Sequence, residues 1–379
     1  MTIDESWKYL SPTKIVFGQN SFDRLKAYLL DLNIKREILL VTGQNFIKKH
    51  GFLVQLHRML YDKSIHHFDK VSPNPNQEDI CQGIQFVGNT EIELVIALGG
   101  GSVLDAGKAI AILLKNPGSL NEYLQGERKI TQRGIPVIAI PTTAGTASEV
   151  TCWATIWDME RKNKYSLSHQ WMFPEYAIVD PALTVPMPRT LTAMTGMDAL
   201  THAIESCWSL NSQPISDVFA LRAIRLIRNN IQKACDKPED MTARTNMALA
   251  SLFAGLAFNN TRTAACHSLS YPMTFHFGIP HGLAVSITLK EVIKYNNRIV
   301  PEKVKQIVEE FGESSVEGFI KAIGELMVSI GLPTKLRDLK LREEDLNVLI
   351  KDSINPERMK NNPANLTEVD IRTILKNVL

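Results

Sequence analysis

The chain has 379 residues, of which 44% are hydrophobic and 22% are charged, and its formal net charge is +2 at pH 7. This length accommodates two domains, each with its own core, and the composition is that of an ordinary soluble protein. The small net charge gives no reason to expect nucleic acid or an anionic membrane as a bulk partner, and charges and glycines interrupt the longest apolar stretches.

The cysteines are few and scattered, without Cys-X-X-Cys spacing. An odd number of widely separated cysteines is typical of reduced thiols in the cytoplasm. Residues 1–8 are polar and mixed in charge, without the apolar segment of a signal peptide. We therefore expect a cytoplasmic protein. The five cysteines are Cys81, Cys152, Cys207, Cys235 and Cys266.

The N-terminal half alternates short apolar strands with helices. Strands of continuous apolar character indicate a parallel sheet that is covered by helices on both faces. The pattern therefore predicts an α/β domain. Strands are expected at residues 14–18, 37–43, 94–98 and 135–141, and helices at residues 21–30, 46–60 and 102–114.

The character of the chain changes between Asp180 and Arg189, where three prolines interrupt regular structure. We expect the domain boundary here, between residues 185 and 186. The remainder predicts an all-α domain. Its helices are expected at residues 192–210, 214–235, 242–259, 315–330 and 366–379.

One helix of the second half carries a pair of candidate metal ligands. Asp198 and His202 are four residues apart, so a helix places both on one face. His267 and His281 follow as third and fourth candidates. One oxygen and three nitrogen ligands are typical of a catalytic Fe, Zn, Co or Ni site, because structural zinc sites more often use thiolates. Alone, an aspartate and a histidine at this spacing are more often a surface or capping feature.

Two loops of small residues follow the third and fourth predicted strands. In Gly99-Gly100-Gly101-Ser102, the glycines let the backbone approach a phosphate at a helix N-terminus. The loop departs from the GxGxxG fingerprint, since Leu104 stands where the third glycine belongs. Residues 141–149 bring four hydroxyls to the carboxyl edge of the sheet, where ligands of open α/β sheets bind. A tight connection or helix capping explains either loop alone, but the two together favour a nucleotide pocket.

These motifs together resemble the iron-dependent (group III) alcohol dehydrogenase family. The resemblance extends from Lys14 to Pro363, effectively the whole chain. The matched stretches are the glycine loop with Asp105 and Lys108, the threonine loop at residues 141–146, the metal helix at residues 196–205, Pro280-His281-Gly282, the Pro73-Asn74-Pro75 loop and Lys164.

The resemblance implies a dehydroquinate synthase-like two-domain plan. Residues 1–185 would form an α/β dinucleotide-binding domain with a Rossmann-like parallel sheet, and residues 186–379 an all-α metal-binding and catalytic domain, with a cleft between them. Dimers formed through the N-terminal strands are usual in the family, so we expect a homodimer.

The resemblance also implies an oxidoreductase that uses NADH or NADPH and one divalent metal, Fe²⁺ first and Zn²⁺ second. An ion with one carboxylate and three neutral imidazoles keeps a net positive charge, so it polarises a carbonyl and stabilises an alkoxide. The implied metal ligands are Asp198, His202, His267 and His281. The implied cofactor-binding residues are Asn74, Gly100, Gly101, Ser102, Asp105, Thr142, Thr143, Thr146, Lys164 and Thr184.

The chain departs from the family pattern at two positions. Many members carry a second histidine, thought to relay protons, where this chain has Tyr271. Tyrosine donates a hydrogen bond but has an ordinary pKa near 10, so Tyr271 is a candidate catalytic residue with an altered proton route. Members that prefer NAD often have an aspartate at the position of Gly43. Its absence, with Lys48 and Lys49 nearby, predicts that NADPH is accepted.

The substrate prediction depends on Arg262, five residues before His267. Most members have a small or apolar residue there, which leaves a pocket for neutral alcohols. A guanidinium at this position would bind a phosphonate, phosphate or carboxylate bidentately, assisted by the hydroxyls of Thr261 and Thr263. The alternative is a structural ion pair at the domain interface. The run from Arg262 to His281 is similar to the phosphonoacetaldehyde reductase branch, which implies phosphonate metabolism and reduction of phosphonoacetaldehyde to 2-hydroxyethylphosphonate.

Three other functions remain open at this point. The first is a general short-chain alcohol dehydrogenase for neutral alcohols. The second is a dehydroquinate-synthase-like lyase or a sugar-phosphate dehydrogenase on the same plan, and the third is a non-catalytic, filament-forming relative. The four candidate ligands argue against the third. We expect a small-molecule aldehyde or alcohol, anionic in its preferred form, as the partner, with no nucleic acid and no membrane.

Overall fold

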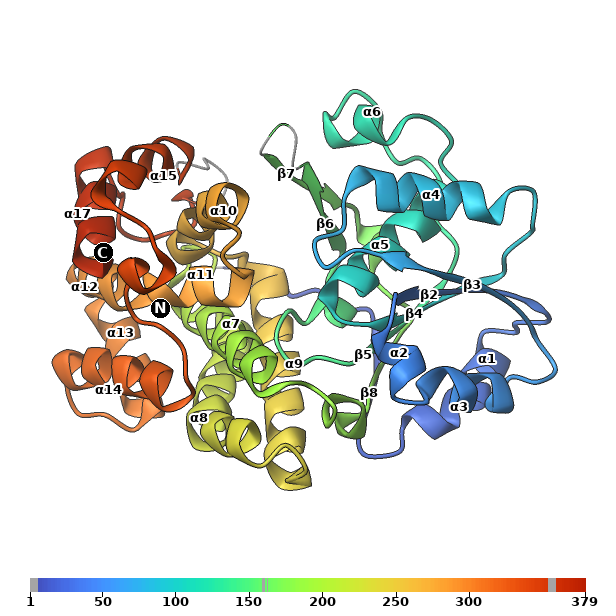
Figure 1. Cartoon of the computed structure of the whole chain (residues 1–379), viewed down its shortest axis with the longest axis horizontal. Coiled ribbons are helices and arrows are strands. Elements are labelled where there is room, and N and C mark those ends of the chain that lie inside the picture. Colours follow the sequence, from blue (N-terminus) through green and yellow to red (C-terminus); the bar gives the residue numbers. More distant parts are fainter. Residues whose placement is uncertain (1–5, 159–160, 162, 354–358) are drawn as a thin grey trace. The chain divides into compact units, whose positions relative to one another are not determined.

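The computed structural model describes residues 6–158, 161, 163–353 and 359–379. These residues form two compact units (Figure 1). The α/β unit comprises Pro12–Met187, and the helical unit comprises Pro188–Leu379 together with residues 6–11. The sequence did not indicate that residues 6–11 belong with the helices. The functional boundary expected at residues 185–186 stays a prediction.

A six-stranded parallel sheet forms the centre of the α/β unit, in the order β1-β8-β5-β4-β2-β3. Strands β4 and β5 are neighbours, with Gly99 opposite Pro141 at their carboxyl ends. The loops that follow these two strands therefore start side by side. The strands are Lys14–Phe17 (β1), Glu37–Gly43 (β2), Ser64–Val71 (β3), Leu94–Gly99 (β4), Val137–Pro141 (β5) and Tyr176–Val179 (β8).

Helices cover both faces of this sheet, as expected. Successive side chains of a strand point to opposite faces, so Leu39 and Val41 join the core beneath α4 and α5, while Ile38 and Leu40 join the core beneath α1, α2 and α3. Because both faces are buried, β2 is apolar from Ile38 to Val41. The helices are Leu25–Asp31 (α1), Phe46–Lys49 (α2), Phe52–Met59 (α3), Gln77–Val87 (α4), Gly101–Leu113 (α5) and Leu120–Leu124 (α6).

Some elements of this unit differ from the sequence expectation. The single helix expected at residues 46–60 is two helices, because Gly51 takes a left-handed conformation with φ of 78° and interrupts it. The polar edge strand β3, strand β8 and helix α4 were not expected. The antiparallel hairpin of β6 (Trp153–Asp158) and β7 (Asn163–Ser168) was also missed.

The long helix α7 lies at the centre of the helical unit and packs against α8, α9 and α11. Every residue from Gly196 to Trp208 is buried. A Cβ on Gly196 would lie 2.6 Å from Ile231 of α8, so the glycine allows the two helices to approach closely. The helices that surround α7 are Pro214–Asp236 (α8), Met241–Thr261 (α9), Ala265–Phe277 (α10), His281–Ile287 (α11) and Pro301–Phe311 (α13).

The remaining described helices complete this unit. We expected helices at the positions of α14 and α17, but not the run from α10 to α13. The all-α character of this part of the chain is confirmed for the described residues, and none of their helices is long and apolar enough to cross a membrane. These helices are Leu289–Ile299 (α12), Val316–Ser329 (α14), Leu346–Ser353 (α15) and Glu368–Val378 (α17).

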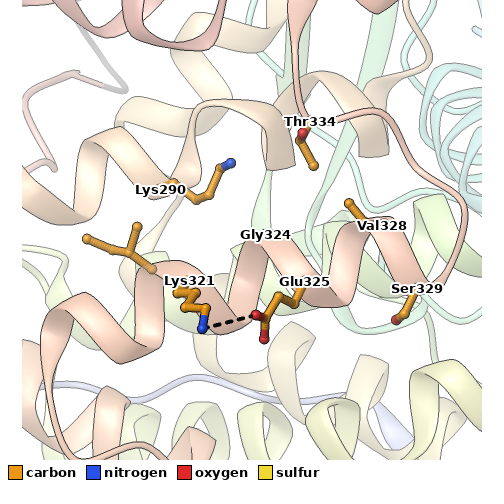
Figure 2. Close-up of a pocket in the computed structure, with 8 residues that line it drawn as sticks. Lys290, Lys321, Gly324, Glu325, Val328, Ser329 and Thr334 are labelled. Carbon is orange, nitrogen blue, oxygen red and sulfur yellow. Dashed lines mark ion pairs between the residues drawn. The ribbon is translucent and has the colours of Figure 1, made fainter.

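A hollow of about 540 Å³ lies over α14 (Figure 2). Lys290 of α12 and Gly324 of α14 are among the residues that line it, and Lys321 forms an ion pair with Glu325 at 3.5 Å. Residues predicted to bind a metal, a cofactor or a substrate do not line this hollow.

Candidate metal centre and cofactor loops

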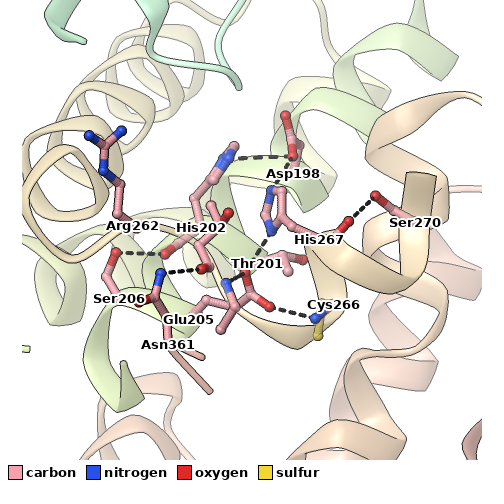
Figure 3. A network of polar contacts seen from close by, with 12 residues as sticks. Asp198, Thr201, His202, Glu205, Ser206, Arg262, Cys266, His267, Ser270 and Asn361 are labelled. Carbon is pink, nitrogen blue, oxygen red and sulfur yellow. Dashed lines mark hydrogen bonds and ion pairs between the residues drawn. The ribbon is translucent and has the colours of Figure 1, made fainter. Parts of the chain in front are cut away.

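The four candidate metal ligands meet within the helical unit. One ligand atom each from Asp198, His267 and His281 lies within 4.8 Å of the other two. Asp198 Oδ1 is 3.6 Å from His267 Nε2 and 3.9 Å from His281 Nε2. His202 lies beside this group, with its Nδ1 3.6 Å from Asp198 Oδ1 (Figure 3). Its ring is stacked on that of Phe258. Three helices thus bring one carboxylate and three imidazoles together.

Helix packing explains why these residues converge. Asp198 and His202 are one turn apart on α7, as their spacing predicts. His281 is the first residue of α11, and Gly282 follows it. A Cβ on Gly282 would lie 2.2 Å from the backbone oxygen of Met194, so only glycine lets α11 approach α7 this closely. The close contact at Gly282 places His281 beside Asp198.

Two buried atoms of this group lack hydrogen-bond partners. Asp198 Oδ1 and His267 Nε2 are both inaccessible, and neither has a hydrogen-bond partner within the described part of the chain. Unpaired buried polar atoms are rare in folded proteins because losing hydration without replacement is costly. A divalent cation between them would satisfy both atoms, and an oxygen with imidazole nitrogens is a ligand set that iron and zinc accept. The residues fit a metal ion.

Glu205, the last residue of the matched metal helix, is a member of this site for which no role was predicted. It is fully buried, and its Oε2 lies 2.6 Å from His267 Nδ1. A carboxylate can only accept, so Nδ1–H donates and Nε2 is left facing Asp198. Glu205 also accepts from the backbone N–H groups of Ala264 and Cys266. The signal was present, because Glu205 lies seven residues after Asp198 and so on the same face of α7.

The charges of the group favour positive charge at its centre. Burial alone would raise the pKa of Asp198, but the attraction of its histidine neighbours outweighs burial and holds this pKa below its usual range. Burial favours the neutral ring of His267, yet Glu205 and Asp198 outweigh it and raise the pKa of His267 to about 9. A bound cation would meet the same electrostatic demand without a proton.

Of the two predicted catalytic residues, Tyr271 contacts a metal ligand, and Arg262 lies five residues before one along the chain. Tyr271 is buried on α10, one turn after His267, and its ring lies parallel to that of His281 at 6.2 Å between centroids. Arg262 ends α9 and is half-buried. Its backbone N–H donates to the carbonyl of Phe258, the residue that stacks on His202. In Figure 3, dashed lines join His202 to Asp198 and to Ser206.

In the α/β unit, the glycine loop and the threonine loop are in direct contact. A Cβ on Gly101 would lie 2.3 Å from the hydroxyl oxygen of Thr146, and one on Gly100 would lie 3.4 Å from Thr143. Gly100 caps α5 with its backbone alone, and no described side chain caps this helix N-terminus. The N–H groups and partial positive charge of such an end suit a phosphate, so the cradle fits the pyrophosphate of a dinucleotide.

Some predicted cofactor-binding residues make internal contacts that shape these loops. Asp105 accepts hydrogen bonds from Ser148 Oγ and, at 2.8 Å, from the N–H of Thr155, and it pairs with the buried Lys108. Thr184 donates to the carbonyl of Pro181 at 2.7 Å. Thr142 is buried at the end of β5, with its N–H donating to Gly99. Asp105 and Thr184 therefore hold backbone groups in place, at Thr155 and at Pro181 respectively.

The loop that contains Asn74 is joined to both the glycine loop and the β6–β7 hairpin. Ser102 Oγ donates to the carbonyl of Pro73, and the N–H of Trp157 donates to the carbonyl of Pro75 at 2.8 Å. Lys164 lies opposite Trp157 in the hairpin, with its Nζ 5.6 Å from the centre of the indole ring. The predicted cofactor residues of three segments are thus gathered in one region of the α/β unit.

Comparison with known proteins agrees with this geometry. Residues 12–181 match the model of the iron-containing alcohol dehydrogenases, and residues 192–379 match the C-terminal model of the Fe-containing alcohol dehydrogenase family. The 1,3-propanediol dehydrogenase of Klebsiella pneumoniae is 34% identical, with 97% of each chain covered. Long-chain-alcohol dehydrogenase 1 of Geobacillus thermodenitrificans is 36% identical, with 96% of each chain covered.

A solved structure is similar over nearly its full length. The sulfoacetaldehyde reductase of Bifidobacterium kashiwanohense, determined in complex with NAD⁺, superposes with a TM-score of 0.93 at 34% identity, with 99% of each chain covered. The chain belongs to the iron-containing alcohol dehydrogenase family and is a metal- and NAD-dependent oxidoreductase that interconverts alcohols and aldehydes.

Proposed function

We propose that this enzyme reduces a short anionic aldehyde to its primary alcohol, with phosphonoacetaldehyde and its product 2-hydroxyethylphosphonate as the first candidates. The observation that carries the proposal is a half-buried arginine, Arg262, five residues before the candidate ligand His267. The similarity to a sulfoacetaldehyde reductase supports it, because sulfoacetaldehyde is also a two-carbon aldehyde with a tetrahedral anionic group. In phosphonoacetaldehyde and in sulfoacetaldehyde, one CH₂ group separates the aldehyde carbonyl from the phosphonate or sulfonate group.

Arg262 suits the recognition of such a group. Its guanidinium presents five N–H donors in a planar fork that matches two oxygens of a phosphonate or sulfonate. The hydroxyl-bearing residues Thr261 and Thr263 flank it, and the hydroxyl of Thr261 lies 3.2 Å from the carbonyl of Arg262. A phosphonate or sulfonate would offer the guanidinium a bidentate acceptor at this position, which a neutral alcohol would not.

We assign Asp198, His202, His267 and His281 as the ligands of one divalent ion, Fe²⁺ first and Zn²⁺ second. When bound, this ion supplies Lewis acidity at the carbonyl oxygen, and reduced nicotinamide supplies the hydride. Tyr271, stacked against His281, is assigned the hydrogen bond from its Oη to the alkoxide oxygen that forms. These residues hold and orient the aldehyde, and Glu205 holds the ring of His267.

We assign the cofactor to the loops of the α/β unit. The backbone of the glycine loop and the α5 N-terminus would bind the pyrophosphate, with hydroxyls of the threonine loop beside it. The Asn74 loop and Lys164 would contact the nicotinamide ribose. The full set is Asn74, Gly100, Gly101, Ser102, Asp105, Thr142, Thr143, Thr146, Lys164 and Thr184.

We also propose a cytoplasmic homodimer. Strand β1 is at the edge of the sheet, and an edge strand presents backbone groups that a second strand can pair with. Ile15 on this strand is 37% exposed, as expected of an apolar residue covered by a partner. The five cysteines are all free, which suits a reducing compartment. Light scattering of the purified chain tests the dimer.

The proposed substrate is tested by comparing Arg262→Ala with the unaltered enzyme on phosphonoacetaldehyde, sulfoacetaldehyde and propanal. We expect KM for the two anionic aldehydes to rise by about tenfold or more and KM for propanal to change little. Arg262→Lys keeps the charge but not the fork, and should recover part of the loss.

A second candidate function is oxidation of neutral alcohols, which the named activities of the 1,3-propanediol and long-chain alcohol dehydrogenases favour. Equal effects of Arg262→Ala on all three aldehydes would select it. A dehydroquinate-synthase-like lyase would show no net consumption of NAD(P)H.

A further inference from the structure

We propose that Asn361, together with Ser209 and Asn211, holds Arg262 in the backbone conformation that directs its guanidinium to the anionic end of the substrate. We call these three residues the arginine clamp. The inference rests on the anionic-substrate function proposed above. It makes Asn361 a positioning residue that determines specificity through Arg262.

The backbone of Arg262 is strained. Its φ is 65° and its ψ is 171°. Side chains of L-residues clash in this region, which is occupied almost only by glycine. Such conformations persist where the surroundings hold them, and they gather at sites of function. An arginine in a glycine conformation therefore needs other groups to keep it there.

The arginine clamp contacts the carbonyl groups on both sides of Arg262. Before it, the carbonyl of Thr261 accepts from Ser209 Oγ at 2.9 Å and from Asn211 Nδ2 at 3.5 Å. After it, the carbonyl of Thr263 accepts from Asn361 Nδ2 at 3.1 Å. These bonds fix the orientation of the two residues that flank Arg262. They therefore oppose relaxation of its φ to an ordinary negative value.

The clamp is itself built from two segments that hold each other. Asn211 Nδ2 donates to Asn361 Oδ1 at 2.9 Å, and the N–H of Leu210 donates to the carbonyl of Asn361 at 3.0 Å. The next residue, Asn362, exchanges amide hydrogen bonds with the buried Asn296 of α12, at 3.0 and 2.9 Å. The α7–α8 connection and the loop before α17 thus form one rigid support.

The support connects Arg262 to the metal ligands. Thr261 and Thr263 are buried, so their carbonyls need these donors. The N–H of Ala264, one residue beyond, donates to Glu205, which orients His267. Figure 3 shows Asn361, Glu205 and Arg262 in this network. A change of φ at residue 262 would swing the long side chain away while leaving the metal group in place, because Glu205 holds the segment beyond.

The first test is kinetic. Asn361→Ala should raise KM for phosphonoacetaldehyde and sulfoacetaldehyde by about tenfold while KM for propanal and the metal content stay within about twofold. Asn377→Ala removes a comparable amide hydrogen bond, to Glu291, and serves as the matched control that should change none of these. Asn361→Ser, a milder change, replaces the first variant if that one does not fold.

The second test is independent of the substrate. Asn361→Ala should lower Tm by a few degrees more in an Arg262→Gly background than in the unaltered chain, because loss of the clamp lets Arg262 relax its strained backbone, which offsets part of the cost, whereas glycine has no strain to release. This coupling supports the clamp even if Arg262 binds no anion, in which case Arg262→Gly affects all three aldehydes equally and only the proposed function fails. Equal Tm losses in both backgrounds would overturn the inference. It would also be overturned if Arg262→Gly raises KM for the anionic aldehydes alone while Asn361→Ala changes KM equally for anionic and neutral aldehydes.

Discussion

The imidazole of His267 lies between two carboxylates, with Nδ1 2.6 Å from Glu205 and Nε2 3.6 Å from Asp198. The shorter contact is a hydrogen bond, and the longer one leaves room for an ion. Glu205 is therefore the group that decides which ring nitrogen faces the ion.

Glu205→Gln should weaken metal binding by about 10- to 100-fold, because the amide no longer gives His267 a charged acceptor. The backbone N–H groups of Ala264 and Cys266 also lose a charged acceptor. Metal titration of the chelated protein measures the effect, and activity should return with excess metal. Unchanged affinity would mean that packing alone orients the ring.

Gly282→Ala should reduce metal binding although it removes no ligand. The new methyl would lie 2.2 Å from the carbonyl oxygen of Met194 and would push His281 away from Asp198. Gly324→Ala is the matched control, since its Cβ would be 3.6 Å from the nearest atom, the flexible end of Lys290. Metal analysis of both variants tests this, and full metal content in Gly282→Ala contradicts it.

Glu149→Gln should stabilise the protein at alkaline pH. Burial raises the pKa of Glu149 from 4.5 to about 7, although nearby Lys108 acts in the opposite direction. The folded state thus binds this proton more tightly than the unfolded state, and stability falls as pH rises from 4.5 to 7.

Glutamine does not titrate, so Glu149→Gln removes this pH dependence. The free energy of unfolding of the variant should therefore exceed that of the unaltered protein by an amount that grows between pH 4.5 and 7 to about 3 kcal/mol. Melting curves of both proteins between pH 4.5 and 8 check it. Glu127→Gln, at an exposed position, is the control. A constant difference across the window would show that Glu149 does not titrate differently on folding.

NADPH should be accepted, and Gly43→Asp should shift preference toward NADH. A Cβ on Gly43 has its nearest neighbour at 3.8 Å, so aspartate fits and its charge would repel a 2′-phosphate. Because Lys48 is paired with Asp69, Lys49 is the better candidate to attract that phosphate. We expect kcat/KM for NADPH to fall about tenfold in Gly43→Asp. A strong preference for NADH in the unaltered enzyme would refute this account.

The local sequence was sufficient to predict those site residues whose type and spacing alone indicate a function. Asp198 and His202 could be paired from helical spacing, and the glycine loop from its position after β4. The helices α7 and α10 are buried on nearly every side, so they lack the amphipathic pattern that identifies surface helices. This explains why α7 was found through its ligands and α10 was missed.

Long-range contacts account for the rest. The partner of Glu205 could not be predicted from local sequence, because the packing of α10 against α7 brings His267 to it. The left-handed backbone of Arg262 follows from donors that are 52 residues before Thr261 and 98 residues after Thr263. No local propensity favours this conformation for arginine, so a sequence window centred on residue 262 predicts an ordinary helix end.

The burial of α7 has a consequence for how an ion is exchanged. The side chains of Asp198, His202 and His267 are 3%, 7% and 3% exposed, whereas that of His281 is 25% exposed. Among these four ligands, His281 is therefore the one that lies nearest to solvent. We therefore expect the residence time of the metal to be set by local opening of the short segment between α10 and α11, on a timescale much faster than global unfolding.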